Sequence, residues 1–366
     1  MIAAFEPNPL GPAIDAQGAL NEQATLYEDF VYYLWQHGLP ELAACGYRLP
    51  GWIMARIVRL PAFLGYATQP DGNLVQIGDS YVERPQVSPR PPHLVAVYPA
   101  GYVFGRSGWG PGASFYSLRF GPRRQVHGHN DHMSLTYYAR GRNLLVNAGH
   151  TGYENTPYRT YLRSPEASNV LVMPGVPFDP SAPTSLVSDQ IGRYGQFYEF
   201  SDTAFGGNPR YRSVYVSQRP DLVLVFDRAS GSDEYQQLWH LDPALRVTRL
   251  GSSYALASAP GTDLVLQQIP LPGQVIPPGS TQVVRGQVRP YQGWVSRQML
   301  QRIPSDVVTM TTTAPSAAML TLIVPAAPGT PTAATISGPP GGPYQLRVRV
   351  GATVASFSIT AGGVIS

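Results

Sequence analysis

The densest group of chemically capable side chains is the segment VHGHNDHMS, which holds His127, His129 and His132 with Asp131 between them. On a strand, His127, His129 and Asp131 would project from one face, because side chains alternate with a period of two. His132 would point to the other face. Imidazoles and a carboxylate on one face can transfer protons or converge on one ligand. We therefore expect a functional role for this segment.

The order His-x-His-x-Asp-His is also the first zinc motif of the metallo-β-lactamase fold. There the motif leads into a helix, and further His and Asp ligands follow it. In this chain it leads into an alternating stretch, SLTYYARGRNLLVN, with only His150 and His240 downstream. A zinc hydrolase that uses the whole His/Asp cluster is therefore a remote alternative, and it predicts tightly bound zinc.

The composition indicates a folded, strand-rich chain. Hydrophobic residues make up 43% of the 366 residues and charged residues 13%, so charge repulsion does not keep the chain unfolded. Gly and Pro number 37 each, which favours short strands joined by turns.

The counts of charged residues and cysteine exclude several function classes. All 26 basic residues are Arg, which excludes Schiff-base chemistry and a P-loop lysine. The net charge of +3 is too small for a nucleic-acid-coating protein, and the single cysteine, Cys45, excludes an intrachain disulfide.

Helical character is confined to residues 19–66. Leu26, Phe30, Val31 and Leu34 recur at three- and four-residue steps and predict an amphipathic helix that ends at Gly38. PELAACG predicts a second, short helix. GWIMARIVRLPAFLGY predicts a third, which its internal proline breaks.

Repeated X-Pro steps over residues 81–94 predict an extended linker. Beyond it, runs such as SFYSLRF, MSLTYYAR, DLVLVFD and YQLRVRV alternate with period two between Gly, Pro, Asp or Asn. The chain is also longer than the roughly 250 to 300 residues at which a single hydrophobic core stops growing, so more than one core or subdomain is expected. The predicted fold class is therefore α+β, with a short helical segment at 1–80, a Pro-rich linker, and a large antiparallel β-sandwich at 95–366.

A longer pattern surrounds the histidine segment. The chain reads GYVFGRSGWG, then FGPRRQVHGHNDHMSLTYYARGRNLLVNAGHTGY, then YLRSPEASNVLVMPG. In order and spacing this resembles the sandwich domain of the heparinase II/III-like polysaccharide lyases. Upstream, NEQATLYEDF and PDGNLVQIGDS resemble the end of that family's helical toroid, so the helical segment is expected to be an incomplete α/α toroid. Downstream, the resemblance extends to about Pro243.

The resemblance implies β-elimination on uronic-acid polysaccharides. In that reaction the sugar carboxylate is neutralised, a base removes the neighbouring proton, and an acid protonates the departing glycosidic oxygen. Tyr27 matches the base by its position in the helix, although it could equally be one of many tyrosines that pack a helix. His127 matches the histidine on the sandwich side of the cleft.

The resemblance also implies a metal site. His129 matches a position that in some members binds a divalent ion, zinc or calcium, together with the Asp of a Leu-Leu-x-Asp-x-Gly strand. That position is Asn147 here, and an amide attracts a divalent ion more weakly than a carboxylate does. Asp131 is a further candidate ligand.

Substrate contacts are expected from Arg106, Arg159, Arg163 and Asn169, because guanidinium groups bind carboxylates in a bidentate manner. An exposed arginine without a partner remains the alternative for each of the three. Ser168 stands where the family usually has a histidine.

The expected partner is an acidic polysaccharide of the glycosaminoglycan or alginate type, with neither nucleic acid nor membrane. The residues before the linker suffice for only three or four helices, whereas the family builds its toroid from many. The chain is therefore expected to be either a fragment, whose partner would be an upstream helical domain absent from this chain, or a shortened member of the family. The resemblance also implies an extracellular or periplasmic location, although no signal peptide is recognisable. The alternative from another class is a non-catalytic carbohydrate-binding or structural module.

Overall fold

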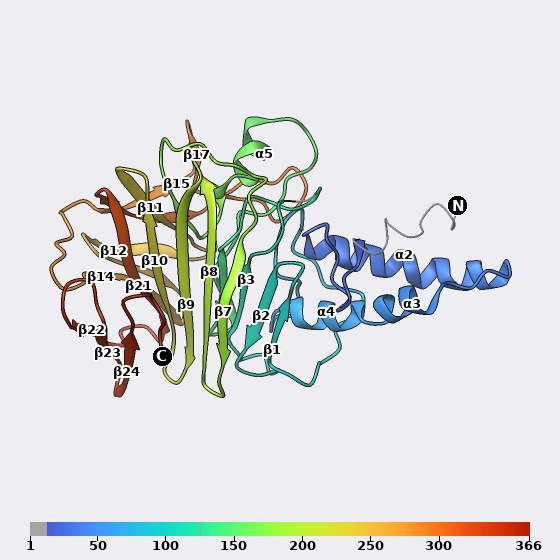
Figure 1. Cartoon of the computed structure of the whole chain (residues 1–366), viewed down its shortest axis with the longest axis horizontal. Coiled ribbons are helices and arrows are strands. Elements are labelled where there is room, and N and C mark those ends of the chain that lie inside the picture. The colour runs from blue at the N-terminus through green and yellow to red at the C-terminus, as the bar shows by residue number, and fades with distance from the viewer. Residues whose placement is uncertain (1–12, 125) are drawn as a thin grey trace.

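Helices lie near the start of the chain and strands fill the rest, as the α+β prediction expects. The computed structural model describes residues 13–124 and 126–366. Figure 1 shows helices α2, α3 and α4 projecting together from one side of a layered β body, next to strands β1 and β2. The helices are α2 (Thr25–Ala44), α3 (Gly51–Ile57), α4 (Leu60–Ala67), α5 (Pro157–Leu162) and the 3-10 helix η2 (Pro165–Ala167).

Helix α2 is longer than predicted, because it continues through Gly38 and Pro40. The prediction that Gly38 ends it is wrong. The left-handed glycine that follows a helix end is instead Gly46, with φ of 79°. The predicted break near Pro61 is confirmed, since α3 ends at Ile57 and Pro61 lies in the first turn of α4.

The apolar side chains predicted to form a stripe on the first helix are largely exposed to solvent. Phe30 and Leu34 are about half exposed, at 51% and 49%. The helix instead buries Glu28 and Asp29, whose carboxylates accept backbone N–H groups of Leu20 and Gln86. Burial raises the pKa of Glu28 well above its ordinary value.

The strands form antiparallel sheets, as predicted. A five-stranded meander comes first, followed by an eight-stranded sheet of order β12-β13-β14-β21-β10-β9-β8-β7 and a four-stranded sheet of order β15-β20-β11-β6. The meander contains β1 (Val95–Tyr98), β2 (Tyr102–Arg106), β3 (Phe115–Arg119), β4 (Leu135–Ala139) and β5 (Arg142–Leu145). The eight-stranded sheet contains β7 (Ser185–Ile191), β8 (Gly195–Phe205), β9 (Asn208–Gln218), β10 (Asp221–Ser230), β12 (Arg246–Gly251), β13 (Tyr254–Ala259), β14 (Thr262–Ile269) and β21 (Ser316–Ala326). The four-stranded sheet contains β6 (Leu171–Val172), β11 (Glu234–His240), β15 (Thr281–Arg285) and β20 (Asp306–Thr313). The remaining strands are β16 (Gln287–Val288), β17 (Tyr291–Gln292), β18 (Trp294–Val295), β19 (Ile303–Pro304), β22 (Thr332–Ser337), β23 (Tyr344–Val350) and β24 (Thr353–Ile359).

Alternation along the strands builds two cores on opposite faces of the eight-stranded sheet. On β10, Val223 and Val225 join the main core with the meander and the four-stranded sheet. Leu222 and Leu224 face the other way and pack against the sheet of β22 to β24. The fold is therefore layered, and β10 contributes to both cores.

A fully buried ion pair joins two neighbouring strands of the large sheet. Arg212 on β9 and Asp227 on β10 are register partners, and both oxygens of the carboxylate lie 2.7 Å from guanidinium nitrogens. Both side chains are completely buried. Gln237 of β11 also donates to Asp227, at 2.7 Å. The main core thus contains a polar network whose charges balance.

The helices are joined to the meander by a buried arginine. Arg106 at the end of β2 donates to the backbone oxygens of Tyr66 and Thr68, both at 2.8 Å, at the end of α4. Its guanidinium also lies 3.9 Å from the ring centroid of Trp109. Phe63 of α4 packs within the same core as Tyr102 and Phe104.

The domain boundaries drawn from the sequence remain predictions. Among the described helices, none combines the length and apolarity needed to span a bilayer.

Stability should fall in mild acid because of His240, which is fully buried on β11 with Nε2 2.9 Å from the backbone oxygen of Glu166. Burial lowers its pKa to about 4. The unfolded chain takes up a proton near pH 6.5, so this stabilisation is present above that pH and is lost as pH falls towards 4. Between about pH 7 and about pH 5, the free energy of unfolding in urea should fall by about 2 kcal/mol more for the wild type than for H240Q. Equal losses in the two proteins would contradict this assignment.

Candidate functional site

The histidine segment is a loop and not a strand. Residues 126–132 form turns and irregular backbone between β3 and β4. The predicted alternation therefore does not apply, and the side chains diverge. His127 turns towards α2, His129 turns towards the loop at Asp79, and Asp131 turns back to Arg119 of β3. His132 contacts Thr184 on a separate segment.

His127 stacks on Tyr27 from helix α2. The two ring centroids are 3.5 Å apart and the planes differ by 11°. Nδ1 of His127 lies 2.8 Å from the carboxylate of Glu22, just before the helix. The loop and the helix therefore hold the predicted catalytic pair, Tyr27 and His127, in direct contact.

A second tyrosine completes this group. The hydroxyl of Tyr153 is hydrogen bonded to the hydroxyl of Tyr27. Burial, followed by the hydrogen bond to Tyr27, raises the pKa of Tyr153 far above its ordinary value. Tyr153 therefore keeps its proton at neutral pH and can donate it in the bond to Tyr27.

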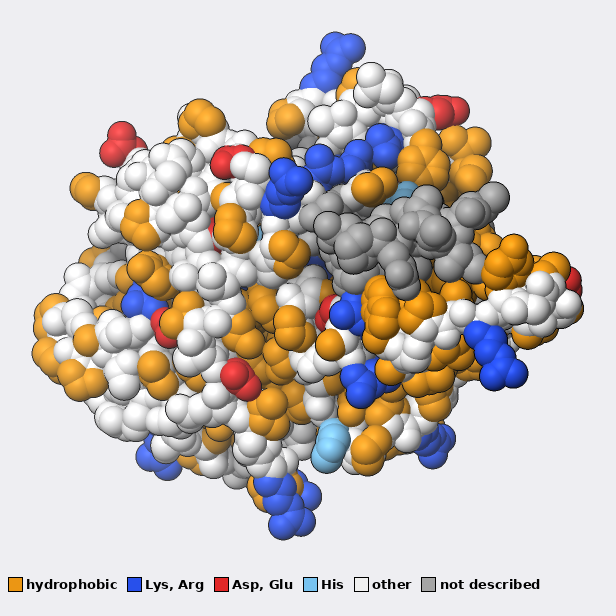
Figure 2. Space-filling model, turned by 45° about the vertical axis from the view of Figure 1, so that its right-hand side comes forward, with side chains coloured by type: hydrophobic (Ala, Val, Ile, Leu, Met, Phe, Trp, Pro, Cys, Tyr) orange, Lys and Arg blue, Asp and Glu red, His pale blue; other side chains and the backbone are white. Residues whose placement is uncertain are grey.

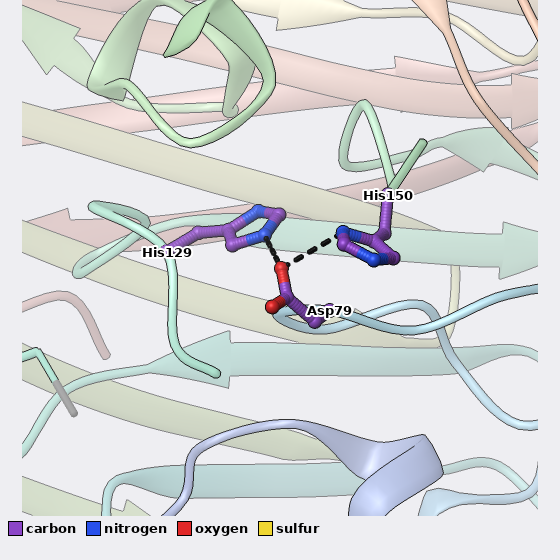
Figure 3. A group of neighbouring side chains, drawn as sticks. All are labelled: Asp79, His129 and His150. Atoms are coloured by element: carbon purple, nitrogen blue, oxygen red, sulfur yellow. Dashed lines mark hydrogen bonds and ion pairs between the residues drawn. The ribbon is translucent and has the colours of Figure 1, made fainter. Parts of the chain in front are cut away.

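A buried Asp/His/His cluster lies beside the tyrosines. The same oxygen of Asp79 is 2.9 Å from Nε2 of His129 and 2.9 Å from Nδ1 of His150, and all three side chains are buried (Figure 3). Burial opposes the charge on Asp79, but the hydrogen bonds and charge of the two histidines outweigh it and hold its pKa below the ordinary value. The other oxygen of Asp79 and Nε2 of His150 have no partner among the described residues.

Gly78 fixes the position of Asp79. Its φ is 64°, and a Cβ here would lie 2.4 Å from the backbone oxygen of Gln23 and 2.6 Å from that of His127. The amide of Asp79 donates to the same oxygen of His127, at 2.8 Å. Only glycine permits three segments to meet this closely.

An open pocket of about 420 Å³ lies against these groups. Its volume falls within the usual range for small-ligand sites. Aromatic rings and carboxylates line it together. The lining residues include Tyr27, Asp79, Tyr81, His150 and Tyr153. The pocket thus brings the tyrosine pair and two members of the Asp/His/His cluster, Asp79 and His150, to one solvent-accessible space.

Two of the predicted metal ligands lie elsewhere. Asp131 is paired with Arg119 at 3.4 Å, and the amide oxygen of Asn147 accepts a hydrogen bond of 2.8 Å from Ser134. The predicted set of His129, Asn147 and Asp131 therefore stays a prediction, and these contacts do not gather it around one point. The structure groups His129 with Asp79 and His150, and these three side chains could hold a metal ion.

The predicted substrate-binding residues separate into two groups. Arg106 and Asn169 lie inside the fold, and the side chain of Asn169 bonds the backbone of Leu135, at 2.7 Å, and of His240. Burial also lowers the pKa of Arg106, to about 10. In contrast, Arg159 and Arg163 are partly exposed at α5 and line a pocket near Tyr153. Only this second pair can reach a ligand in the described conformation.

Comparison with known proteins defines the family. The heparinase II/III-like, C-terminal family model matches residues 90–314, more than half of the chain. The chain belongs to the heparinase II/III-like family. This confirms the resemblance seen in the sequence.

Solved structures of this family share the fold. The structure is similar to heparan sulfate lyase HepC from Pedobacter heparinus, with 15% identity and a TM-score of 0.81, over 95% of this chain and 60% of that one. It is also similar to a heparinase III structure, with 13% identity and a TM-score of 0.79, over 96% of this chain and 62% of the other. The chain thus spans about 60% of the length of these structures. The search of curated proteins found no significant match.

Sequence reasoning missed three residues of the heparinase-like site. Asp79 lies on a loop far along the chain from the loop that carries both His150 and Tyr153, and the fold brings the two loops together. Short signals were nevertheless present in the sequence, since Asp79 ends the GNLVQIGD turn and GHTGY carries the other two. Glycines beside polar residues in a loop indicate close backbone packing, which is typical of sites.

Proposed function

We propose that this chain is a polysaccharide lyase component that cleaves a uronate-containing glycan by β-elimination. The observation that carries the proposal is the contact of Tyr27 with both His127 and Tyr153 at the open pocket. Family membership and the likeness to lyase folds support the same reaction class. The reaction needs a base and an acid near one sugar ring, and this pocket offers both kinds of group.

Tyr27 is the proposed base. Its hydroxyl is hydrogen bonded to that of Tyr153, and with Tyr153 as the donor this bond would stabilise negative charge on the oxygen of Tyr27. His127, when protonated, adds positive charge against the face of the ring. The phenolate would remove the proton next to the uronate carboxylate, and the electron pair left behind forms the carbon–carbon double bond.

The departing glycosidic oxygen needs the second proton. As the double bond forms, the bond from the ring carbon to this oxygen breaks and the oxygen takes a proton. Tyr27, protonated by the first step, can return that proton on the same side of the ring, while Tyr153 keeps its own. No further reactant is required. His150, whose Nε2 has no partner among the described residues, is the proposed contact for the sugar carboxylate.

The Asp79, His129 and His150 cluster fits a zinc ion better than a calcium ion. Zinc favours few ligands of mixed nitrogen and oxygen type, whereas calcium takes six or more oxygens. The unpartnered oxygen of Asp79 gives the cluster spare coordinating capacity. If the cluster holds zinc, Asp79, His129 and His150 would hold the ion, and it would join three loops by charge and coordination.

Zinc should stabilise the protein through this cluster. At about a hundredfold excess over the dissociation constant, added zinc is expected to raise the Tm by on the order of 5 °C, and calcium should not. D79N should lose this shift in differential scanning fluorimetry. D131N should keep it, because Asp131 pairs with Arg119 outside the cluster. A shift lost in D131N and kept in D79N would contradict the assignment.

Absorbance of the unsaturated uronate product tests the proposed function. The purified chain is offered heparan sulfate, heparin, hyaluronan, chondroitin and alginate, with and without chelator. A rise in absorbance with any substrate supports the lyase and identifies its substrate class. If no substrate gives a rise in absorbance while circular dichroism shows folded protein, the proposal fails for this chain. Non-catalytic carbohydrate binding then becomes the better hypothesis.

The zinc-hydrolase alternative lacks a site in the described residues. It requires His127, His129, Asp131 and His132 around one ion, but the loop sends these side chains to different neighbours. The zinc-hydrolase hypothesis therefore has no geometric support.

A further inference from the structure

Three arginines surround a second pocket beside the proposed catalytic one. Arg124, Arg159 and Arg163 line a space of about 280 Å³, together with side chains that can donate hydrogen bonds. These are Asn130, Asn155, Thr160 and Ser164. None of the lining residues carries a carboxylate. The pocket therefore concentrates positive charge.

The three guanidinium groups lie without a paired carboxylate within the described part of the chain. None of them forms an ion pair there, and the Nε atom of each is buried without a partner. Burial and the charges of Arg124 and Arg159 lower the pKa of Arg163, and the carboxylate of Asp79 only partly offsets them. Like charges held together without a paired carboxylate cost free energy, and a bound anion would reduce that cost.

The second pocket is coupled to the proposed site through one ring. The guanidinium of Arg159 lies 5.3 Å from the ring centroid of Tyr153, whose hydroxyl bonds Tyr27. An oxyanion held by the arginines would therefore belong to a sugar close to the one undergoing elimination. Figure 2 shows arginine side chains gathered in a row on the face that it presents.

We propose that Arg124, Arg159 and Arg163 form a subsite for a sulfate group of the polysaccharide. This inference rests on the proposed function for its ligand, because it assumes a glycan that reaches the pocket of Tyr27. A sulfate ester offers three oxygens to three converging cations, whereas a carboxylate offers two. The subsite thus selects sulfated glycans over unsulfated ones.

Calorimetric titration with two matched probes tests the subsite without relying on turnover. One probe is a size-fractionated heparin oligosaccharide, and the other is the same oligosaccharide chemically desulfated and N-acetylated, which keeps its carboxylates. R163Q should weaken binding of the sulfated probe by about tenfold and leave the desulfated probe nearly unchanged. R349Q, an exposed arginine of β23 in another sheet, should change neither affinity.

The outcomes separate the two proposals. Selective loss in R163Q supports the subsite even if wild type binds without cleaving, in which case only the lyase proposal fails. Cleavage by wild type with unchanged affinity in R163Q overturns the subsite and leaves the lyase in place. Equal loss on both probes also overturns it, because the arginines would then bind a carboxylate. Circular dichroism checks that R163Q is folded, and R124Q repeats the test from outside α5.

Discussion

Tyr27→Phe should reduce product formation by between about 100-fold and 10,000-fold on whichever polysaccharide wild type cleaves. The substitution removes one oxygen and leaves the ring, so the stacking on His127 and the packing of α2 remain. Because that oxygen is the proposed base, kcat should fall while the affinity for substrate changes little. Initial rates from product absorbance and binding titrations measure the two effects separately.

Two variants sharpen the test of the base. Tyr47→Phe removes a hydroxyl from an exposed ring beyond the end of α2 and should retain full activity. Tyr153→Phe removes the hydroxyl that is hydrogen bonded to Tyr27 and should lower kcat less than Tyr27→Phe does. If Tyr27→Phe keeps more than about a tenth of wild-type kcat, proton transfer must be assigned to another group.

Arg212→Met should destabilise the fold by about 3 to 5 kcal/mol. The methionine replaces the cation by an apolar chain, which leaves the carboxylate of Asp227 fully buried without its charge partner. It also removes a donor to the backbone oxygen of Met133 at 2.8 Å. Chemical denaturation with matched wild-type controls measures the loss.

The same substitution at an exposed arginine provides the control. Arg246 lies 3.5 Å from Asp306 with its side chain 56% exposed, so Arg246→Met should cost less than about 1 kcal/mol. The double variant R212M/D227L should be more stable than R212M, because no buried charge remains unpaired. If the double variant were less stable than R212M, the cost of leaving the Asp227 carboxylate buried without a partner could not explain the loss of stability in R212M.

The fold class could be predicted because its signal is local. Alternation in DLVLVFD gives the two faces of β10, which pack into different cores. Pro61 marks the break before α4, since proline suits a first helical turn. Gly38 misled the prediction because glycine permits a helix end without requiring one, and the left-handed glycine of α2 is Gly46.

The candidate site could be predicted only in part. The dense His/Asp segment points to His127 by itself, whereas Tyr27 follows only from the family pattern, and the structure brings the two into contact. The strand expected for the histidine segment ignored Gly128, where a Cβ would lie 2.4 Å from the side chain of Gln23. Because this loop packs closely against the helical segment, its backbone is irregular and its side chains do not alternate between two faces as they would on a strand.

The three-way contact at Gly78 limits how the sequence of such a protein can diverge. The aromatic surface of the pocket can change while preserving its shape, and loops at the outer edges of the sandwich can lengthen freely. Position 78 has no such freedom, because any side chain there would separate the backbone oxygens of Gln23 and His127 that it now lies between. A descendant that lost this glycine would keep its sandwich and lose the alignment of its two halves. Divergence at this single position would therefore separate the Tyr27 side of the candidate site from the His127 side.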